Sequence, residues 1–115
     1  MRGINRVVLS GNVGDRVVYG ETRTGTQACS FSVASDRYDG EGVVTAWVRI
    51  NLYGDDLVRV CREKLTKGMY VIVEGELMNR DGTTGELTEV RAREVVFVSN
   101  NQKGSRRFED GERDG

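Results

Sequence analysis

The sequence predicts an all-β fold, a five-stranded Greek-key barrel with one short helix between the third and fourth strands. Five segments alternate apolar and polar side chains with the two-residue period of a strand. One segment, residues 55–67, has the apolar spacing of a helix instead. The chain holds 15 glycines and no proline, so its turns must come from glycine, asparagine and aspartate.

The length of 115 residues suits one domain with one hydrophobic core. We expect this domain to span residues 1–99. A short, disordered, polar and acidic tail is expected over residues 100–115, where the composition turns polar and glycine-rich. The five strands are expected at residues 4–13, 27–35, 43–53, 70–79 and 87–98.

The first expected strand contains a continuous apolar run of Val7, Val8 and Leu9. Such a run is typical of a strand that is covered on both faces. The glycine-rich residues 11–15 then predict a bend, and residues 16–19 a bulged extension of the strand.

The second expected strand places Cys29, Phe31 and Val33 on one face, which we expect to be the core. A loop is expected to follow over residues 36–42. The other cysteine, Cys61, lies far away in the sequence, and the pair lacks the spacing of metal ligands. Two reduced thiols in the core are therefore expected.

The third expected strand organises the chain, because both of its faces are distinctive. One face is wholly apolar: Val44, Ala46, Val48, Ile50 and Leu52. The other face carries Thr45, Trp47, Arg49, Asn51 and Tyr53. An open sheet face normally presents polar residues to water. Aromatic rings interleaved with arginine suit stacked nucleobases with phosphates alongside, although a second packing surface such as a subunit interface would explain them too.

The helix is expected to bury a stripe formed by Leu57, Val58, Cys61 and Leu65 and to end at Lys67, before Gly68. In the fourth strand Val71, Val73 and Leu77 share one face, and Gly75 indicates a bend or a close backbone approach. A hairpin turn with an Asp-Gly pair is expected over residues 79–85. In the last strand strict alternation places Thr88, Val90, Ala92 and Val96 on one face and Glu89, Arg91, Arg93 and Val95 on the other.

Composition argues against an enzyme and against a membrane protein. The chain has no histidine, which removes the commonest general base and most catalytic zinc sites, so no metal, cofactor or catalytic residue is expected. Two carboxylate pairs, at residues 55–56 and at Glu74 and Glu76, are the remaining acid–base candidates. No apolar run could span a bilayer and no signal-peptide pattern opens the chain, which points to the cytoplasm. The net charge of −1 gives no global basic signature for nucleic acid.

Three strands, one helix and a two-strand hairpin form the element order of an OB-fold, whose sheet face and hairpin loops take single strands. Several short blocks also resemble the bacterial-type single-stranded DNA-binding proteins, and they occur in that family's order. The blocks are residues 2–14, 31–35, 45–49, 52–54, 65–68, 71–77 and 88–90. Together they cover residues 2–98.

The resemblance implies an OB-fold protein that is usually a homotetramer, with a dimer as the alternative. Such a protein coats single-stranded DNA without reading its sequence, and it is associated with the nucleoid. The family's binding aromatics match Tyr38, Trp47 and Tyr53. A further aromatic that many members carry in the last hairpin has no counterpart in residues 79–85. Many members also end in an acidic tip closed by apolar residues. This chain ends in acidic residues without that apolar end, which places recruitment of repair or replication proteins through the tip in doubt.

These features together predict a non-catalytic coat used in DNA replication, recombination and repair. Three aromatics stack on bases, and a set of arginines contacts phosphates. This set comprises Arg49, Arg91 and Arg93, together with Arg80, Arg6 and Arg2. For Arg49, Arg91 and Arg93 the alternative is a surface ion pair with a carboxylate. For the whole chain the alternative is an OB-fold paralogue that acts mainly as a protein-docking module in a replication or primosome assembly.

Overall fold

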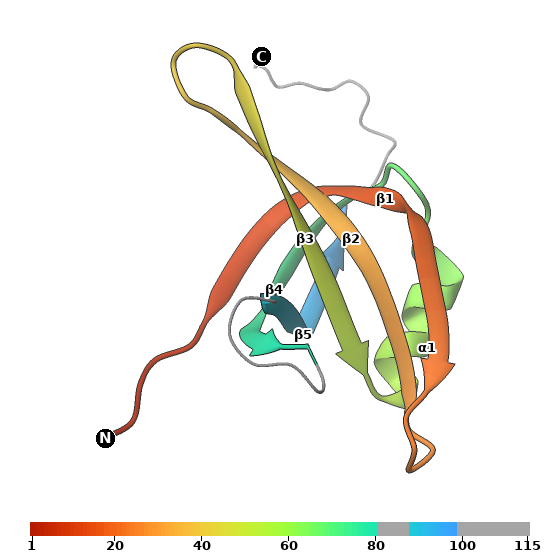
Figure 1. The fold of residues 1–115 in the computed structure, drawn as a ribbon. Coiled ribbons are helices and arrows are strands. Elements are labelled where there is room, and N and C mark those ends of the chain that lie inside the picture. The colour runs from red at the N-terminus through yellow and green to blue at the C-terminus, as the bar shows by residue number, and fades with distance from the viewer. Residues whose placement is uncertain (81–87, 99–115) are drawn as a thin grey trace.

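The computed structural model, which describes residues 1–80 and 88–98, is a closed five-stranded barrel with one helix (Figure 1). The elements are β1 (Val7–Glu21), β2 (Gln27–Tyr38), β3 (Val43–Tyr53), α1 (Asp55–Lys64), β4 (Tyr70–Asn79) and β5 (Thr88–Phe97). Around the barrel the strands follow the order β1, β2, β3, β5, β4, and β4 closes the barrel by pairing with β1. Only the contact between β3 and β5 is parallel. The predicted OB-fold barrel is confirmed.

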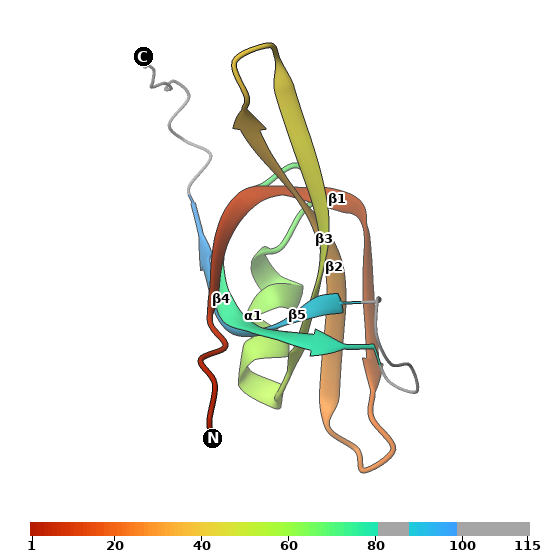
Figure 2. The same cartoon turned by 60° about the vertical axis from the view of Figure 1, so that its left-hand side comes forward.

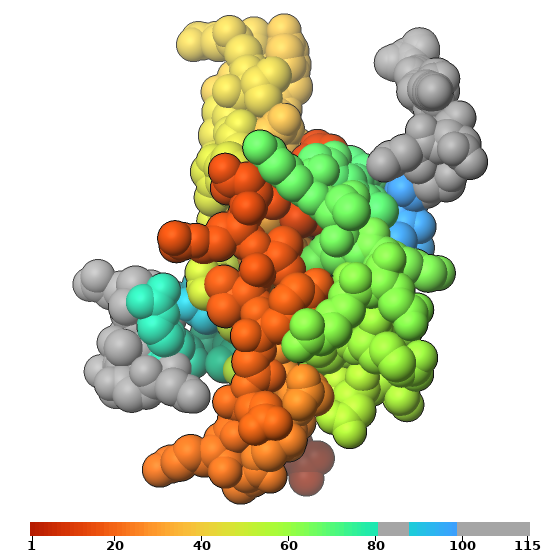
Figure 3. Space-filling model, turned by 90° about the vertical axis from the view of Figure 1, so that its right-hand side faces the viewer, coloured from red at the N-terminus to blue at the C-terminus, as the bar shows by residue number. Residues whose placement is uncertain are grey.

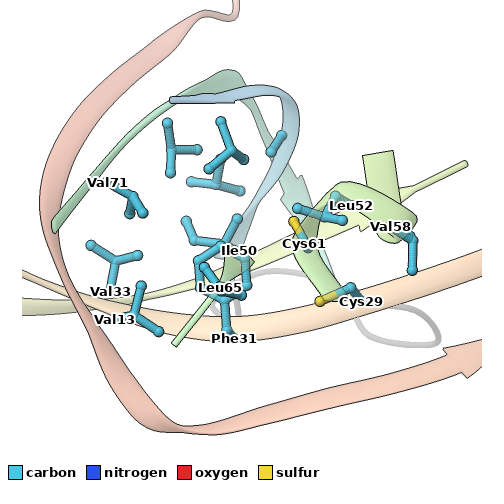
Figure 4. Close-up of a cluster of buried hydrophobic side chains, with 14 residues drawn as sticks. Val13, Cys29, Phe31, Val33, Ile50, Leu52, Val58, Cys61, Leu65 and Val71 are labelled. Atoms are coloured by element: carbon cyan, nitrogen blue, oxygen red, sulfur yellow. The ribbon is translucent and has the colours of Figure 1, made fainter. Parts of the chain in front are cut away.

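Apolar side chains from all five strands and from α1 fill the interior (Figure 4). The predicted core face of β2 is confirmed, since Cys29, Phe31 and Val33 are all buried. Cys61 of α1 belongs to the same cluster, and both cysteines are free thiols, as predicted. Burial of this cluster supplies the main drive to fold.

β1 is one long, strongly curved strand that pairs with β4 in its first half and with β2 in its second (Figures 1 and 2). The register with β2 shifts between Val13 and Val17, so the predicted bulged extension is confirmed. The strand starts at Val7 rather than at residue 4. The expectation that Val8 is covered on both sides was wrong, because Val8 lies on the outer face of the barrel and is 61% exposed.

The end of β2 and the start of β3 form a hairpin that projects from the barrel (Figures 1 and 3). The predicted loop over residues 36–42 was therefore too long, because β2 continues to Tyr38. The β3 bounds were predicted correctly, but only half of its apolar face is core. Ile50 and Leu52 are buried inside the barrel, whereas Val44 and Ala46 lie on the projecting hairpin and are exposed.

The helix buries Val58 and Cys61, and Leu65 follows it into the core, as the apolar stripe predicted. Its predicted end at Lys67 was wrong by three residues, because α1 ends at Lys64 and Leu65 is already extended. Gly68 has a positive φ of 85° in the turn that leads into β4, where a residue without Cβ is favoured.

A bulge in β5 breaks the alternation that the sequence predicted for the last strand. Glu74 pairs with Glu94 while Gly75 pairs with Ala92, so one extra residue of β5 interrupts the alternation. As a result Val95 is buried at 9% exposure and Val96 is 45% exposed, so the predicted grouping of Val96 with the buried Val90 and Ala92 was wrong.

Gly75 confirms its predicted close backbone approach, since a Cβ there would collide with the carbonyl of Arg91. β4 bends along its length (Figure 2). Leu77, which alternation groups with the buried Val71 and Val73, is exposed beyond this close approach and lies outside the buried cluster.

Two predicted segments, the hairpin turn beyond Arg80 and the tail over residues 100–115, lie outside the described residues. The proposed boundary of the domain therefore stays a prediction. No helix in the described part of the chain is long and apolar enough to cross a membrane.

Candidate nucleic-acid interface

The outer face of β2 and β3 presents large side chains on one strand and small ones on the next. We call this surface the β2–β3 platform. It comprises Trp47, Arg49, Asn51 and Tyr53 on β3 and, directly opposite each, Ala34, Ser32, Ser30 and Ala28 on β2. Cross-strand partners stand close together on the same face. The small β2 residues therefore leave open space beside the rings and the guanidinium group of β3.

Trp47 is not a core residue, because 66% of it is exposed. One side of its indole ring lies over β1, where a Cβ added at Gly14 would stand 3.3 Å from the ring atom Cζ3. Gly14 lies in the part of β1 where the register shifts, so the bulge and the missing side chain together make room for the ring. An exposed indole with one supported edge can offer a ring face to a ligand.

Tyr53 ends the β2–β3 platform and is half-buried. The guanidinium carbon of Arg91, from β5, lies 5.1 Å from the centre of its ring, which is a cation–π contact. Arg91 therefore supports Tyr53 as well as adding positive charge beside it.

A groove runs past Tyr53, formed by two adjoining hollows that share Tyr53 and Met78. The first hollow, of about 460 Å³, is completed by Arg49, Asn51, Arg80 and Glu89. The second, of about 340 Å³, is completed by Arg91 and by three threonines of the loop between β1 and β2, namely Thr22, Thr24 and Thr26. The groove therefore combines an aromatic ring, a thioether, guanidinium groups and hydroxyls. Such a lining can bind both the bases and the phosphates of an unpaired strand.

Glu89 is the exception in this groove, because it is a carboxylate and only 6% exposed. Its Oε1 accepts a hydrogen bond of 2.7 Å from Asn51 Nδ2, and its Oε2 accepts one of 2.9 Å from Arg80 Nε. Burial alone would raise the pKa of the Glu89 carboxyl. The hydrogen bonds from Arg80 and Asn51 and the charges of Arg80 and Arg49 outweigh burial, and the pKa of Glu89 is lowered from 4.5.

The predicted arginines are divided between the groove and other places. Arg49, Arg80 and Arg91 line the groove, and Arg80 is bonded to Glu89. Arg6 pairs with Glu74 at 2.9 Å, and Arg93 pairs with Glu76 at 3.7 Å.

Arg2 is exposed ahead of β1, and neither Arg2 nor Arg6 nor Arg93 lines a hollow of the groove. Among the described residues, Arg49 forms no ion pair within 4.0 Å, although its charge acts on Glu89. The ion-pair alternative thus applies to Arg93 but not to Arg49.

Tyr38 lies at the end of the projecting hairpin, far along β2 from the groove. Its cross-strand partner is Val43, and it shares the outer face with Trp47. The hairpin around it is acidic, with Asp36, Asp39 and Glu41 against Arg37. The structure therefore does not bring Tyr38 into one site with Tyr53.

Sequence reasoning missed six of the described residues that line the groove. Asn51 could have been found, because it alternates with Trp47, Arg49 and Tyr53 on one face. The three loop threonines recur at every second position, which is a weaker signal. Met78 and Glu89 reach the groove through the pairing of β4 with β5, and nothing in the sequence alone fixes that register.

The acid–base candidates have other roles in the structure. Asp56 pairs with Arg59 at 3.1 Å in the first turn of α1, and Glu74 and Glu76 form the ion pairs given above. Within residues 1–80 and 88–98, no group of three or more histidine, cysteine or acidic side chains is placed to hold a metal ion.

The buried carboxylate yields a prediction on stability. Folding lowers the pKa of Glu89, so its ionised form stabilises the folded state above the pKa of the unfolded chain, and this contribution is lost as the pH falls through the folded-state pKa. Glu89→Gln should therefore unfold at a lower temperature than the wild type near neutral pH, and the difference should shrink below about pH 4.5. Thermal unfolding followed by circular dichroism between roughly pH 7 and 3 measures it.

The control is Glu63→Gln, which removes an exposed carboxylate from α1. Its unfolding temperature should match that of the wild type across the whole pH range. A difference in unfolding temperature between Glu89→Gln and the wild type that stays constant with pH would show that the charge of Glu89 does not contribute to stability.

Comparison with known proteins agrees with this fold. Residues 4–103 match the Single-strand binding protein family. Single-stranded DNA-binding protein 2 of Chlorobaculum tepidum is 30% identical, over 96% of this chain and 82% of that protein. The single-stranded DNA-binding protein of Xanthomonas campestris is 34% identical, over 90% of this chain and 65% of that protein.

A solved structure, described as Plasmodium falciparum SSB in complex with ssDNA, superposes with a TM-score of 0.75. The match covers 86% of this chain and 98% of that one at 24% identity, and it shows the shared fold. From the family match, the two bacterial relatives and the common barrel, we conclude that this chain belongs to the single-strand binding protein family.

Proposed function

We propose that this protein coats single-stranded DNA without reading its sequence and without catalysing a reaction. The observation that carries the proposal is the exposed Trp47 on the same sheet face as Tyr53, with small residues opposite both. Soluble sheets do not usually present a tryptophan to water beside open space. Every base has a flat π-face, so rings placed in this way bind bases of any sequence.

Phosphates are bound, in this proposal, mainly by Arg49 and Arg91, which border the groove on either side of Tyr53. The threonine hydroxyls of the loop between β1 and β2 can donate hydrogen bonds to the same backbone. Arg80 contributes less charge than expected, because Glu89 neutralises it. Duplex DNA is a poor ligand because its bases are already stacked on one another.

The kinship with single-stranded DNA-binding proteins supports a role wherever single strands arise, in replication, recombination and repair. We place the protein with the nucleoid in the cytoplasm for the same reason.

The direct test of stacking is Trp47→Ala, compared with Trp47→Phe. The alanine variant should fold like the wild type, because Trp47 lies outside the core. It should lose about 1–3 kcal/mol of binding free energy for oligo-dT, roughly 5- to 150-fold in Kd, because one base loses its ring partner. The phenylalanine variant should keep most of the affinity. Fluorescence anisotropy of a labelled oligonucleotide gives all three constants.

Unchanged affinity in a folded Trp47→Ala variant would remove Trp47 from the site, and unfolding would assign it a packing role. A wild type that binds neither single strands nor duplex would favour the other function, a protein-docking module in a replication or primosome assembly.

We also propose that the protein is a homo-oligomer, a tetramer or a dimer, that associates through the outer face of β1, β4 and β5. Val8, Ile72 and Val96 are exposed on this face, and the pairing of β4 with β5 sets Ile72 beside Val96. Burial of such an apolar face against a second copy is favourable.

For the wild type, light scattering should give two or four times the chain mass of 12.8 kDa. Ile72→Glu should lower that mass, because a charge in the interface is costly to bury. The matched control is Val18→Glu, on an exposed valine where β1 pairs with β2, and it should leave the mass unchanged. A monomeric wild type would contradict the proposal.

A further inference from the structure

Glu89 stands out because a charged side chain is rarely buried unless it is held by partners. Among the described residues, Glu89 is the one polar or charged residue that is buried, and it lies in the wall of the proposed binding groove. A carboxylate at this position repels the phosphates of a bound strand and so lowers the affinity of the groove for DNA. Its role must therefore involve its two hydrogen-bond partners, Asn51 and Arg80.

Glu89 fixes the orientation of the Asn51 amide. An ionised carboxylate only accepts hydrogen bonds, so the amide must turn its Nδ2 group toward Glu89, as observed at 2.7 Å. The carbonyl oxygen Oδ1 is then left as an acceptor on the other side of the amide. No hydrogen bond to this oxygen comes from residues 1–80 or 88–98.

Asn51 is also placed where a base edge would lie. It is between Arg49 and Tyr53 on the same face of β3, and all three line the first hollow of the groove. Residues two apart on a strand are roughly 6–7 Å apart, which is about the width of a base. A base stacked on Tyr53 would therefore bring its polar edge to the Asn51 oxygen.

We propose that Asn51 accepts a hydrogen bond from the N–H edge of a nucleobase stacked at Tyr53, and that Glu89 is the positioning residue that turns the Asn51 oxygen toward it. Each of the four bases carries an N–H donor on its pairing edge, so this contact is compatible with binding of any sequence. It selects instead for unpaired bases, because in a duplex these donors are already used. This inference rests on the proposed function of the groove.

The test compares two labelled oligonucleotides of about 12 nucleotides, a length within the range of one OB-fold site. One is oligo-dT and the other is oligo-N3-methyl-dT. Thymine has one edge N–H, at N3, and methylation removes this donor while keeping the ring for stacking. The wild type should bind the methylated strand about 3- to 10-fold more weakly, the worth of one hydrogen bond. Asn51→Ala should bind the two strands equally.

Two further variants separate this contact from other effects. Trp47→Ala should bind both strands more weakly but keep the wild-type ratio between them. Glu89→Gln should give an intermediate ratio, because a neutral amide can donate or accept and no longer fixes Asn51. A purely structural role of Glu89 would change both affinities and leave the ratio untouched.

Two results would overturn the inference. In one, the wild type binds both strands equally. In the other, Asn51→Ala keeps the wild-type ratio, which would mean that the methyl group is rejected elsewhere. If the wild type binds neither strand, the proposed function itself fails.

Discussion

The register between β2 and β3 is the constraint on which the rest of this structure depends. The two strands pair without interruption from Ala28 and Tyr53 to Tyr38 and Val43. This register places Phe31 opposite Ile50 inside the barrel and, three residues further along β2, Ala34 opposite Trp47 outside it. A shift of one residue would exchange the two faces. The same pairing therefore makes both the core and the surface proposed to bind DNA.

Much of the fold could be predicted because the alternation is regular where a strand has one buried face. Cys29, Phe31 and Val33 followed the pattern. The errors lie where a single feature breaks the period, as the bulge in β5 does for Val95 and Val96. They also lie where a regular strand leaves the barrel, because alternation in Val44 and Ala46 carries no information about what covers them.

The candidate site could be predicted only where one strand carries it. Trp47, Arg49 and Tyr53 share a face because of their spacing alone. The partners of the other arginines depend on which strands become neighbours. Arg80 meets a carboxylate of β5 because β4 pairs with β5. Arg6 meets a carboxylate of β4 because β1 pairs with β4 where the barrel closes. The chain can therefore have a net charge of −1 and still present positive charge at Arg49 and Arg91.

The central claim is that the exposed indole on β3 contacts unpaired bases. Trp47 is the one tryptophan in the chain, so its fluorescence reports on this surface directly. The measurement is a titration with long oligo-dT and with duplex DNA, at low and at moderate salt. If the indole contacts bases, oligo-dT alone should quench the fluorescence saturably, and more weakly at the higher salt concentration because phosphate contacts are screened. Absence of quenching, together with no binding by a second method, would contradict the claim and identify this face as a protein interface.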